Sequence, residues 1–212
     1  MNQQQREWNI FGHVLNTLDL SIYVLMLVAL LSGVAGIWLG PIVNVVLLIC
    51  IAAIAVLVWR TTLKHRVTRI ALFAIEAFIG LSALQGGVAL LRGDFLNVVP
   101  VDWLAGTPFS DYTIPGLTLV IIVGGSALLA AATVFIEREW AVLISVLAGL
   151  IMIGFEVVEM VSVNGKVGGD ALPMALGLQL FYFVLGLAAF GLAGYLWMRE
   201  YRGQHIHSGN VS

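Results

Sequence analysis

Long apolar stretches set the strongest limit on what this chain can fold into. A helix needs about 20 consecutive apolar residues to cross the roughly 30 Å of hydrocarbon in a bilayer. Six stretches reach that length and predict six transmembrane helices: 20–39, 41–59, 70–91, 115–136, 140–163 and 172–198. Of all 212 residues, 60% are apolar and 10% are charged, whereas a soluble domain has about a quarter of its residues charged. The sequence therefore predicts an all-α integral membrane protein, a six-helix bundle over 20–198.

The distribution of lysine and arginine predicts the orientation of these helices, because cytoplasmic loops carry an excess of both. When the linker between the second and third spans is placed in the cytoplasm, eight of the ten Lys and Arg residues lie on that side. The eight are Arg6, Arg60, Lys64, Arg66, Arg69, Arg138, Arg199 and Arg202, and the other side has Arg92 and Lys166. We therefore expect both termini in the cytoplasm, the second as a polar tail at 199–212.

Residues 1–19 form a polar segment before the first span. Within it Trp8, Phe11, Leu15 and Leu18 recur at helical spacing, which predicts a short amphipathic helix. We expect this helix to lie in the cytoplasmic interface. A frayed, partly ordered segment is the alternative.

The loop 92–114 is the long connection on the outside. It is rich in apolar residues, but Pro100, Pro108 and Pro115 prevent a long helix. We expect an interfacial cap over the outer end of the bundle. A shallow re-entrant dip is the alternative, and it would need shelter from the surrounding protein.

Two short motifs flank the start of the fourth span. They are Leu104-Ala105-Gly106-Thr107-Pro108-Phe109 and Ile114-Pro115-Gly116, followed by Gly124-Gly125 inside the span. Over about 80–133 the sequence resembles a group of small bacterial multi-pass membrane proteins in which a T-P-F…P-G stretch precedes a glycine-containing helix. The resemblance implies a bacterial membrane protein and supplies no catalytic residues.

Residue types and positions exclude several classes of membrane protein. All four histidines and both lysines lie outside the predicted spans, which argues against a haem, a pigment ligand or a retinal Schiff base. The sequence has no H-E-x-x-H motif and no serine with a histidine at matching depth, as intramembrane proteolysis would need. A formal charge of -2 leaves no basic surplus for nucleic acid. We expect no cofactor, no metal and no enzyme activity; a lone cysteine, Cys50, excludes an intrachain disulfide or a thiolate zinc site.

Polar residues within the spans are the candidate functional residues, since an ionised side chain in hydrocarbon costs about 2.5–3.5 kcal/mol. Glu156 and Glu159 are three residues apart and share one face of the fifth span. With a rise of about 1.5 Å per residue, Glu156 falls about 10 Å below the outer boundary. Gln85 and Gln179 fall at about the same depth, and Asn44 lies nearer the outer surface. These five residues predict a polar layer under the outer loop.

Two interpretations of this layer are open. In the structural one, Glu156 is protonated or hydrogen-bonded to Gln85 or Gln179, and the layer fixes the helix register. In the functional one, the layer lines a proton or small-solute site that opens outward, with Arg92 as a counter-ion. Intramembrane acids favour a functional hypothesis, whereas Glu159 is near enough to the interface to be hydrated.

Glu76 is the candidate acid of the inner leaflet, about 10 Å above the cytoplasmic end of the third span. It lies on a stripe of small residues and faces about 180° away from Gln85. Candidate partners are Ser145, Thr133 and a snorkelling Arg69. A proton relay between Glu76 and Glu156 would need a link, for which Ser126 is the candidate.

The linker between the second and third spans carries a cluster of basic residues. These residues, Arg60, Lys64, Arg66 and Arg69, could contact anionic lipid heads at about 1 kcal/mol each. Their alternative role is to set the topology alone.

Three functions follow from the sequence. The prediction is a non-catalytic structural or interaction component of a bacterial cytoplasmic (inner) membrane. It would contact the lipid bilayer, and other membrane proteins or further copies through small-residue helix faces. The alternative is a small proton-coupled transporter or permease that uses Glu156 and Glu76. A remoter alternative is a lipid- or quinone-modifying enzyme with Glu156 and Glu159 as acid and base, although no nucleophile or metal ligand set accompanies them.

Overall fold

The computed structural model describes residues 65–94, 99–163, 167 and 171–202, together with a few earlier positions (8–10, 13–15, 21, 24, 25, 28, 53 and 56). The chain divides into two compact units, Met1–Ile70 and Ala71–Ser212, and each is described by itself. The predicted spans 20–39 and 41–59 lie almost entirely outside the described residues, as does most of the tail 199–212.

In the first unit, the described residues near the amino terminus form a hairpin. Strand β1 (Trp8–Ile10) pairs antiparallel with β2 (His13–Leu15), with Trp8 opposite Leu15. The predicted amphipathic helix within 1–19 is therefore wrong for these residues. Two residues separate the strands in the sequence, the second of them Gly12, and two-residue connections with glycine favour a hairpin.

Four helices among the described residues are long and apolar enough to cross a membrane. They are α3 (Arg66–Arg92), the fourth span Thr113–Thr133, α6 (Glu139–Val163) and α7 (Ala171–Glu200). They lie over the predicted stretches 70–91, 115–136, 140–163 and 172–198, so four of the predicted long apolar helices are confirmed. Their ends differ from the prediction by a few residues, because polar residues such as Glu139 continue a helix beyond its apolar stretch.

Local signals explain where these helices begin and end. At the end of α3, Gly93 adopts a positive φ of 75°, which glycine tolerates without steric cost. Its amide donates to the carbonyl of Leu90, and the amide of Asp94 donates to that of Ala89. This pair of bonds is a Schellman motif, which satisfies the last carbonyls of the helix. At the start of α6, Glu139 places a negative charge in the first turn, where the helix dipole stabilises it.

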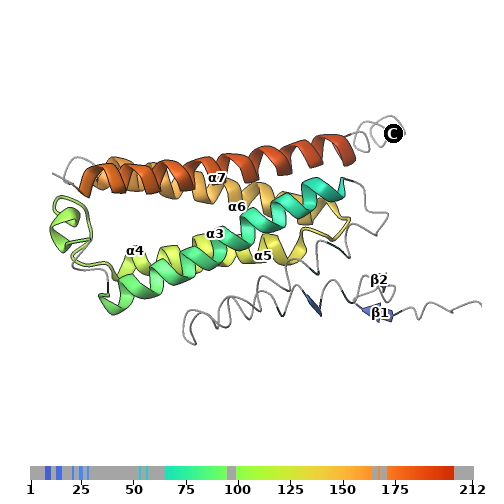
Figure 1. Cartoon of the computed structure of the whole chain (residues 1–212), viewed down its shortest axis with the longest axis horizontal. Helices are drawn as coiled ribbons and strands as arrows, with labels where there is room; N and C mark the ends of the chain where they lie inside the picture. Colours follow the sequence, from blue (N-terminus) through green and yellow to red (C-terminus); the bar gives the residue numbers. More distant parts are fainter. Residues whose placement is uncertain are drawn as a thin grey trace, which may run out of the picture. The chain divides into compact units, whose positions relative to one another are not determined.

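The helices of the second unit pack side by side as antiparallel neighbours (Figure 1). Helices α6 and α7 approach closely, since a Cβ atom at Gly149 would lie 2.7 Å from the amide nitrogen of Phe190. On the other side of the bundle, α3 packs on the fourth span through Gly80 and Gly87, which contact Leu128 and Val120. Small residues at both contacts allow the backbones to approach closely, as is common between helices in membranes.

The fourth span is not a uniform α-helix. It consists of α4 (Thr113–Leu117), a π-helical segment η2 (Thr118–Gly124) and α5 (Gly125–Thr133). The sequence predicted an uninterrupted helix here. A π-helical turn carries one more residue than an α-helical turn and is rare outside functional or strained sites. The wider turn lies beside α3, where Gly87 meets both Val120 and the carbonyl of Gly116.

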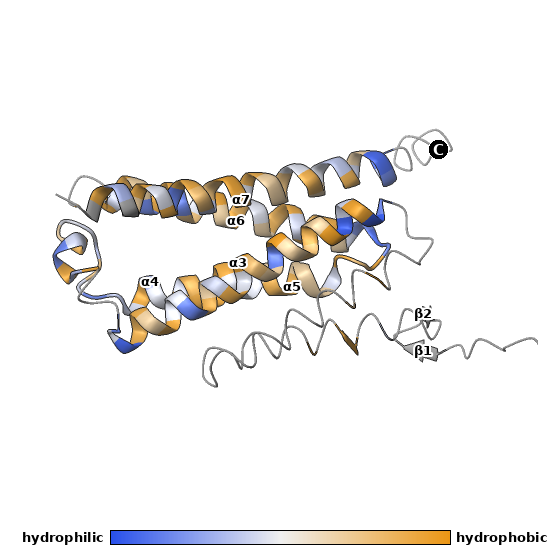
Figure 2. Ribbon diagram, in the orientation of Figure 1, coloured by the Kyte–Doolittle hydropathy of each residue, from blue (hydrophilic) through white to orange (hydrophobic). Residues whose placement is uncertain are grey.

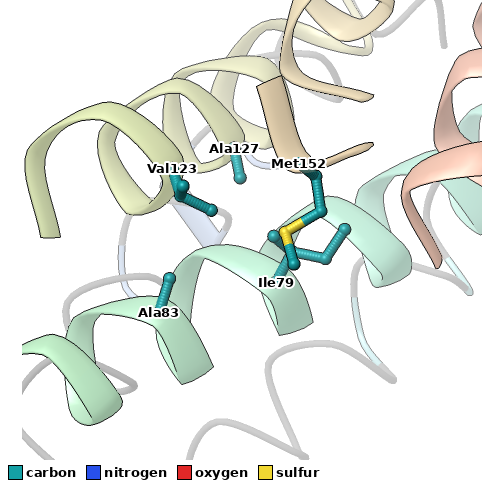
Figure 3. Close-up of a cluster of buried hydrophobic side chains, with 5 residues drawn as sticks. All are labelled: Ile79, Ala83, Val123, Ala127 and Met152. Carbon is teal, nitrogen blue, oxygen red and sulfur yellow. The ribbon is translucent and has the colours of Figure 1, made fainter. Parts of the chain in front are cut away.

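An apolar cluster joins three of the four spans near the middle of the bundle (Figure 3). Its members are Ile79 and Ala83 of α3, Val123 of η2, Ala127 of α5 and Met152 of α6. All five are buried. We call this cluster the apolar layer.

Large apolar side chains also cover the outward faces of the helices. Ile121, Leu147, Val158 and Val184 are each more than 50% exposed. Figure 2 shows hydrophobic residues along the length of the four helices and hydrophilic residues at several of their ends. An apolar exterior on this scale fits a lipid surrounding, because monomers in water rarely expose large contiguous apolar patches.

The described part of the outer loop folds back on the bundle. A short 3-10 helix, η1 (Val101–Leu104), contacts α6 and buries Leu104. Beyond it, the hydroxyl of Thr107 donates to the carbonyl of Leu104 at 2.7 Å. The hydroxyl of Tyr112 donates to the carbonyl of Pro100 at 3.0 Å, which closes the loop just before α4 begins.

Candidate functional site

Two acids of α6 and one amide of α7 meet near the end of the bundle where α6 ends and α7 begins. Glu156 is 3% exposed and Gln179 is 2% exposed, while Glu159 is partly buried. The Gln179 side-chain amide donates from Nε2 to Glu159 Oε1 at 3.2 Å. Glu159 is also the charged group that acts on Glu156 electrostatically, one helical turn away. The structure thus brings together three of the five residues predicted to form the outer polar layer.

A tyrosine of the outer loop joins this group. Tyr112 is 8% exposed, and its hydroxyl is close enough to Glu159 to be influenced by that charge. Burial raises the pKa of Tyr112 to about 12, and the charge of Glu159 adds to this effect. We call Tyr112, Glu156, Glu159 and Gln179 the outer carboxyl cluster.

The position of Tyr112 is fixed by the turn that opens the fourth span. The carboxylate of Asp111 accepts a hydrogen bond from the backbone amide of Thr113 at 2.8 Å, which satisfies one amide of the helix start. This bond holds the pKa of Asp111 below its usual value. Sequence reasoning missed Tyr112. The available signal was an Asp-Tyr pair directly before a helix start, in a loop already expected to cover the outer end.

Two other predicted members of the layer are not placed in it. Gln85 is exposed on α3, and the structure does not bring it to the cluster. Asn44 lies outside the described residues. Arg92, the predicted counter-ion, is exposed at the end of α3.

Two oxygen atoms of the cluster are buried without a hydrogen-bond partner among the described residues. They are Oε2 of Glu156 and Oε1 of Gln179. Buried polar atoms are nearly always hydrogen-bonded, so each exception needs an explanation such as a water or an ion.

The inner acid is separate from this cluster. Glu76 is 1% exposed on α3, and neither of its carboxyl oxygens has a hydrogen-bond partner in the described part of the chain. Ser145 of α6, one of the predicted partners, lies close to the Glu76 carboxyl group. Thr133 donates instead to the carbonyls of its own helix. Arg69, the third predicted partner, is fully buried on α3.

The apolar layer lies between the two acids. Along one face of α6, Ser145 is near Glu76, Met152 belongs to the apolar layer, and Glu156 belongs to the outer carboxyl cluster. Ser126, the predicted link, donates its hydroxyl to the carbonyl of Val123 in its own span. The Ser126 hydroxyl is therefore engaged within its own helix and is not shown to link Glu76 to Glu156.

The described residues place neither the basic linker nor a group of metal ligands at the outer carboxyl cluster. Arg60 and Lys64 lie outside the described residues, and Arg66 is partly buried. Within the described ranges, no group of three or more His, Cys, Asp or Glu side chains is placed to hold a metal ion.

Comparison of the sequence with protein-family models, with curated proteins and with solved structures gives no match. The chemistry of the described residues therefore carries the functional argument.

Proposed function

We propose that this chain is a non-catalytic multi-pass membrane protein that acts as a structural or interaction component. In this proposal it crosses a bacterial cytoplasmic membrane six times, with both termini in the cytoplasm. The four apolar helices support a membrane location. The distribution of Lys and Arg in the sequence supports the orientation.

The apolar layer is the observation that carries the proposal. A pathway for protons or polar solutes needs a continuous route of polar groups or water across the bundle. Met152, Ile79 and Val123 belong instead to a packed apolar cluster (Figure 3), whose members follow Glu76 along α3 and precede Glu156 along α6. In this arrangement Glu76 and the outer carboxyl cluster fix how the helices pack, as polar residues between helices in membranes do.

Three glycines of α7 that have free space beside them support a role in binding another membrane helix. A Cβ atom at Gly177, Gly191 or Gly194 would meet no atom within 4 Å. These positions leave room for another helix to approach closely, in a partner protein or in a second copy of the chain.

A proton-coupled transporter is the second candidate, and one observation favours it. Glu76 and Glu156 are both almost fully buried acids, and each has a carboxyl oxygen without a hydrogen-bond partner in the part of the chain that the structure describes. A carboxyl group without a partner in the membrane is costly, and such acids line many ion pathways.

Proton flux separates the two candidates. The purified chain is placed in proteoliposomes, a membrane potential is imposed, and flux is compared among wild type, Glu156→Gln, Glu76→Gln and Asp111→Asn. Asp111 is an exposed acid outside the spans and serves as the matched control. We expect no flux in wild type above protein-free vesicles, while an added protonophore collapses the gradient in every sample.

Flux in wild type that is lost in both buried-acid variants but kept in Asp111→Asn would overturn the proposal. The transporter would then take its place.

A further inference from the structure

The outer carboxyl cluster contains more hydrogen-bond acceptors than donors. When both carboxyl groups are ionised they only accept, so Glu156 and Glu159 then supply four acceptor oxygens. The donors are the Gln179 amide and the Tyr112 hydroxyl, and the latter donates to the carbonyl of Pro100. A buried cluster with such a surplus needs protons or a cation to balance it.

The orientation of the Gln179 side chain adds one more unpaired acceptor to the cluster. Its Nε2 donates to Glu159, because a carboxylate accepts from the amino end of an amide and repels the carbonyl end. Oε1 of Gln179 is therefore the end of the amide that does not bond to Glu159, and it is buried without a hydrogen-bond partner in the described structure. Oε2 of Glu156 is also buried without a hydrogen-bond partner among the described residues.

The register of α6 and α7 brings Glu156 and Gln179 to adjoining turns of the two helices. Gly186 lies against Ile153, so the next turn of α6 toward the outside, which carries Glu156, faces the turn of α7 between Tyr182 and Gln179. The amide of Gln179 meets Glu159 one further turn out. Glu156 and Gln179 thus lie within about one turn of each other across the helix contact, and each has a buried oxygen with no hydrogen-bond partner among the described residues.

We propose that Glu156, Glu159 and Gln179 bind one alkali cation, Na⁺, between the outer ends of α6 and α7. The ligands are carboxylate and amide oxygens, which suit hard cations and not the softer transition metals. A divalent ion such as Ca²⁺ takes six to eight oxygens, more than these three side chains supply. The cation reaches the site from the outside past Glu159, which is partly exposed, while η1 and Tyr112 lie against the same end of α6.

Na⁺-dependent stability and direct binding test this proposal on the full-length protein in detergent. Thermal unfolding is measured in NaCl and in N-methylglucamine chloride at equal ionic strength, and radioactive Na⁺ binding is measured at equilibrium. Binding to the folded state alone raises the unfolding temperature in a saturable way. We expect this rise in wild type, and a loss of Na⁺ affinity of about tenfold or more in Glu156→Gln and Gln179→Leu.

Glu76→Gln is the matched control, because it removes an acid that is as deeply buried but lies outside the cluster. It keeps wild-type Na⁺ affinity. If Glu156→Gln fails to fold, Glu159→Gln replaces it, since Glu159 is partly exposed.

Three results overturn the proposal. The first is no saturable Na⁺ binding to wild type, which needs no variant to interpret. The second is equal affinity in wild type and in the folded cluster variants. The third is stabilisation by lower pH with no effect of Na⁺ at any pH, which would mean that protons on Glu156 and Glu159, next to Tyr112, balance the cluster instead.

Discussion

Tyr112 links the outer loop to the helix bundle through a single hydroxyl group. It donates to the carbonyl of Pro100 while lying near the charge of Glu159. A neutral hydroxyl suits both surroundings, since a phenolate could not donate and would repel the carboxylate. Burial is the larger cause of this preference, and the neighbouring charge is the smaller one.

Alkaline titration should show this preference. Because the pKa of Tyr112 is raised to about 12, above the value of about 10 in an unfolded chain, the folded state keeps its proton longer. The resulting stabilisation is complete below pH about 10 and is lost as the pH rises through 12. Phenolate absorbance of the folded protein should therefore include a late-titrating tyrosine that is absent from Tyr112→Phe. If the two titration curves coincide, Tyr112 is not held neutral by its surroundings.

Residue-scale reasoning from the sequence found the acids but not all of their neighbours. Glu156, Glu159 and Gln179 were predicted together because equal depth and helical spacing follow from a fixed rise per residue. Gln85 was predicted with them on depth alone, although its direction around α3 depends on how that helix is rotated in the bundle. Tyr112 comes from a loop, whose path no periodic pattern defines.

The contact between helices α6 and α7 depends on Gly149, because a Cβ atom at this position would collide with the backbone of α7. A Cβ atom at Gly149 would lie 2.7 Å from the amide nitrogen of Phe190, so Gly149→Ala must push the two helices apart. We expect a loss of about 1–3 kcal/mol of stability, measured as a lower unfolding temperature in detergent.

Gly154→Ala is the control for this change. It lies on the same helix with nothing within 4 Å of the added Cβ, so only the helix propensity changes, by up to about 1 kcal/mol in favour of alanine. Equal unfolding temperatures for the two variants would contradict the packing at Gly149.

The helices themselves were easier to predict than their irregularities. A long apolar stretch predicts a helix because every backbone amide and carbonyl in lipid must be paired internally, and four of the predicted apolar helices are confirmed. The π-helical segment η2 was not predicted, since its residues are as apolar as those around it. The hairpin of β1 and β2 was missed because four apolar residues at helical spacing are a weak signal in a segment of that length.

At the scale of the whole molecule, the orientation in the membrane can be measured directly. Cys50 is the one cysteine of the sequence, so a Cys50→Ser background allows single-cysteine labelling. With both termini in the cytoplasm, a membrane-impermeant maleimide should label Ser110→Cys in intact cells and Ser208→Cys only after lysis. Ser110 is exposed in the outer loop, which makes it accessible from that side. The reverse labelling pattern would invert the proposed topology.

The π-helical segment η2 is a position at which the fourth span can lose one residue without changing which way its two ends face. Because η2 holds an extra residue, a one-residue deletion there would leave an ordinary α-helix whose two ends keep their original faces. The same deletion in the middle of α6 would rotate everything beyond it by about 100° and turn Glu156 and Glu159 away from Gln179. The fourth span is thus the place in the bundle that can absorb a deletion, whereas α6 has a fixed residue count between its inner end and the carboxyl groups at its outer end.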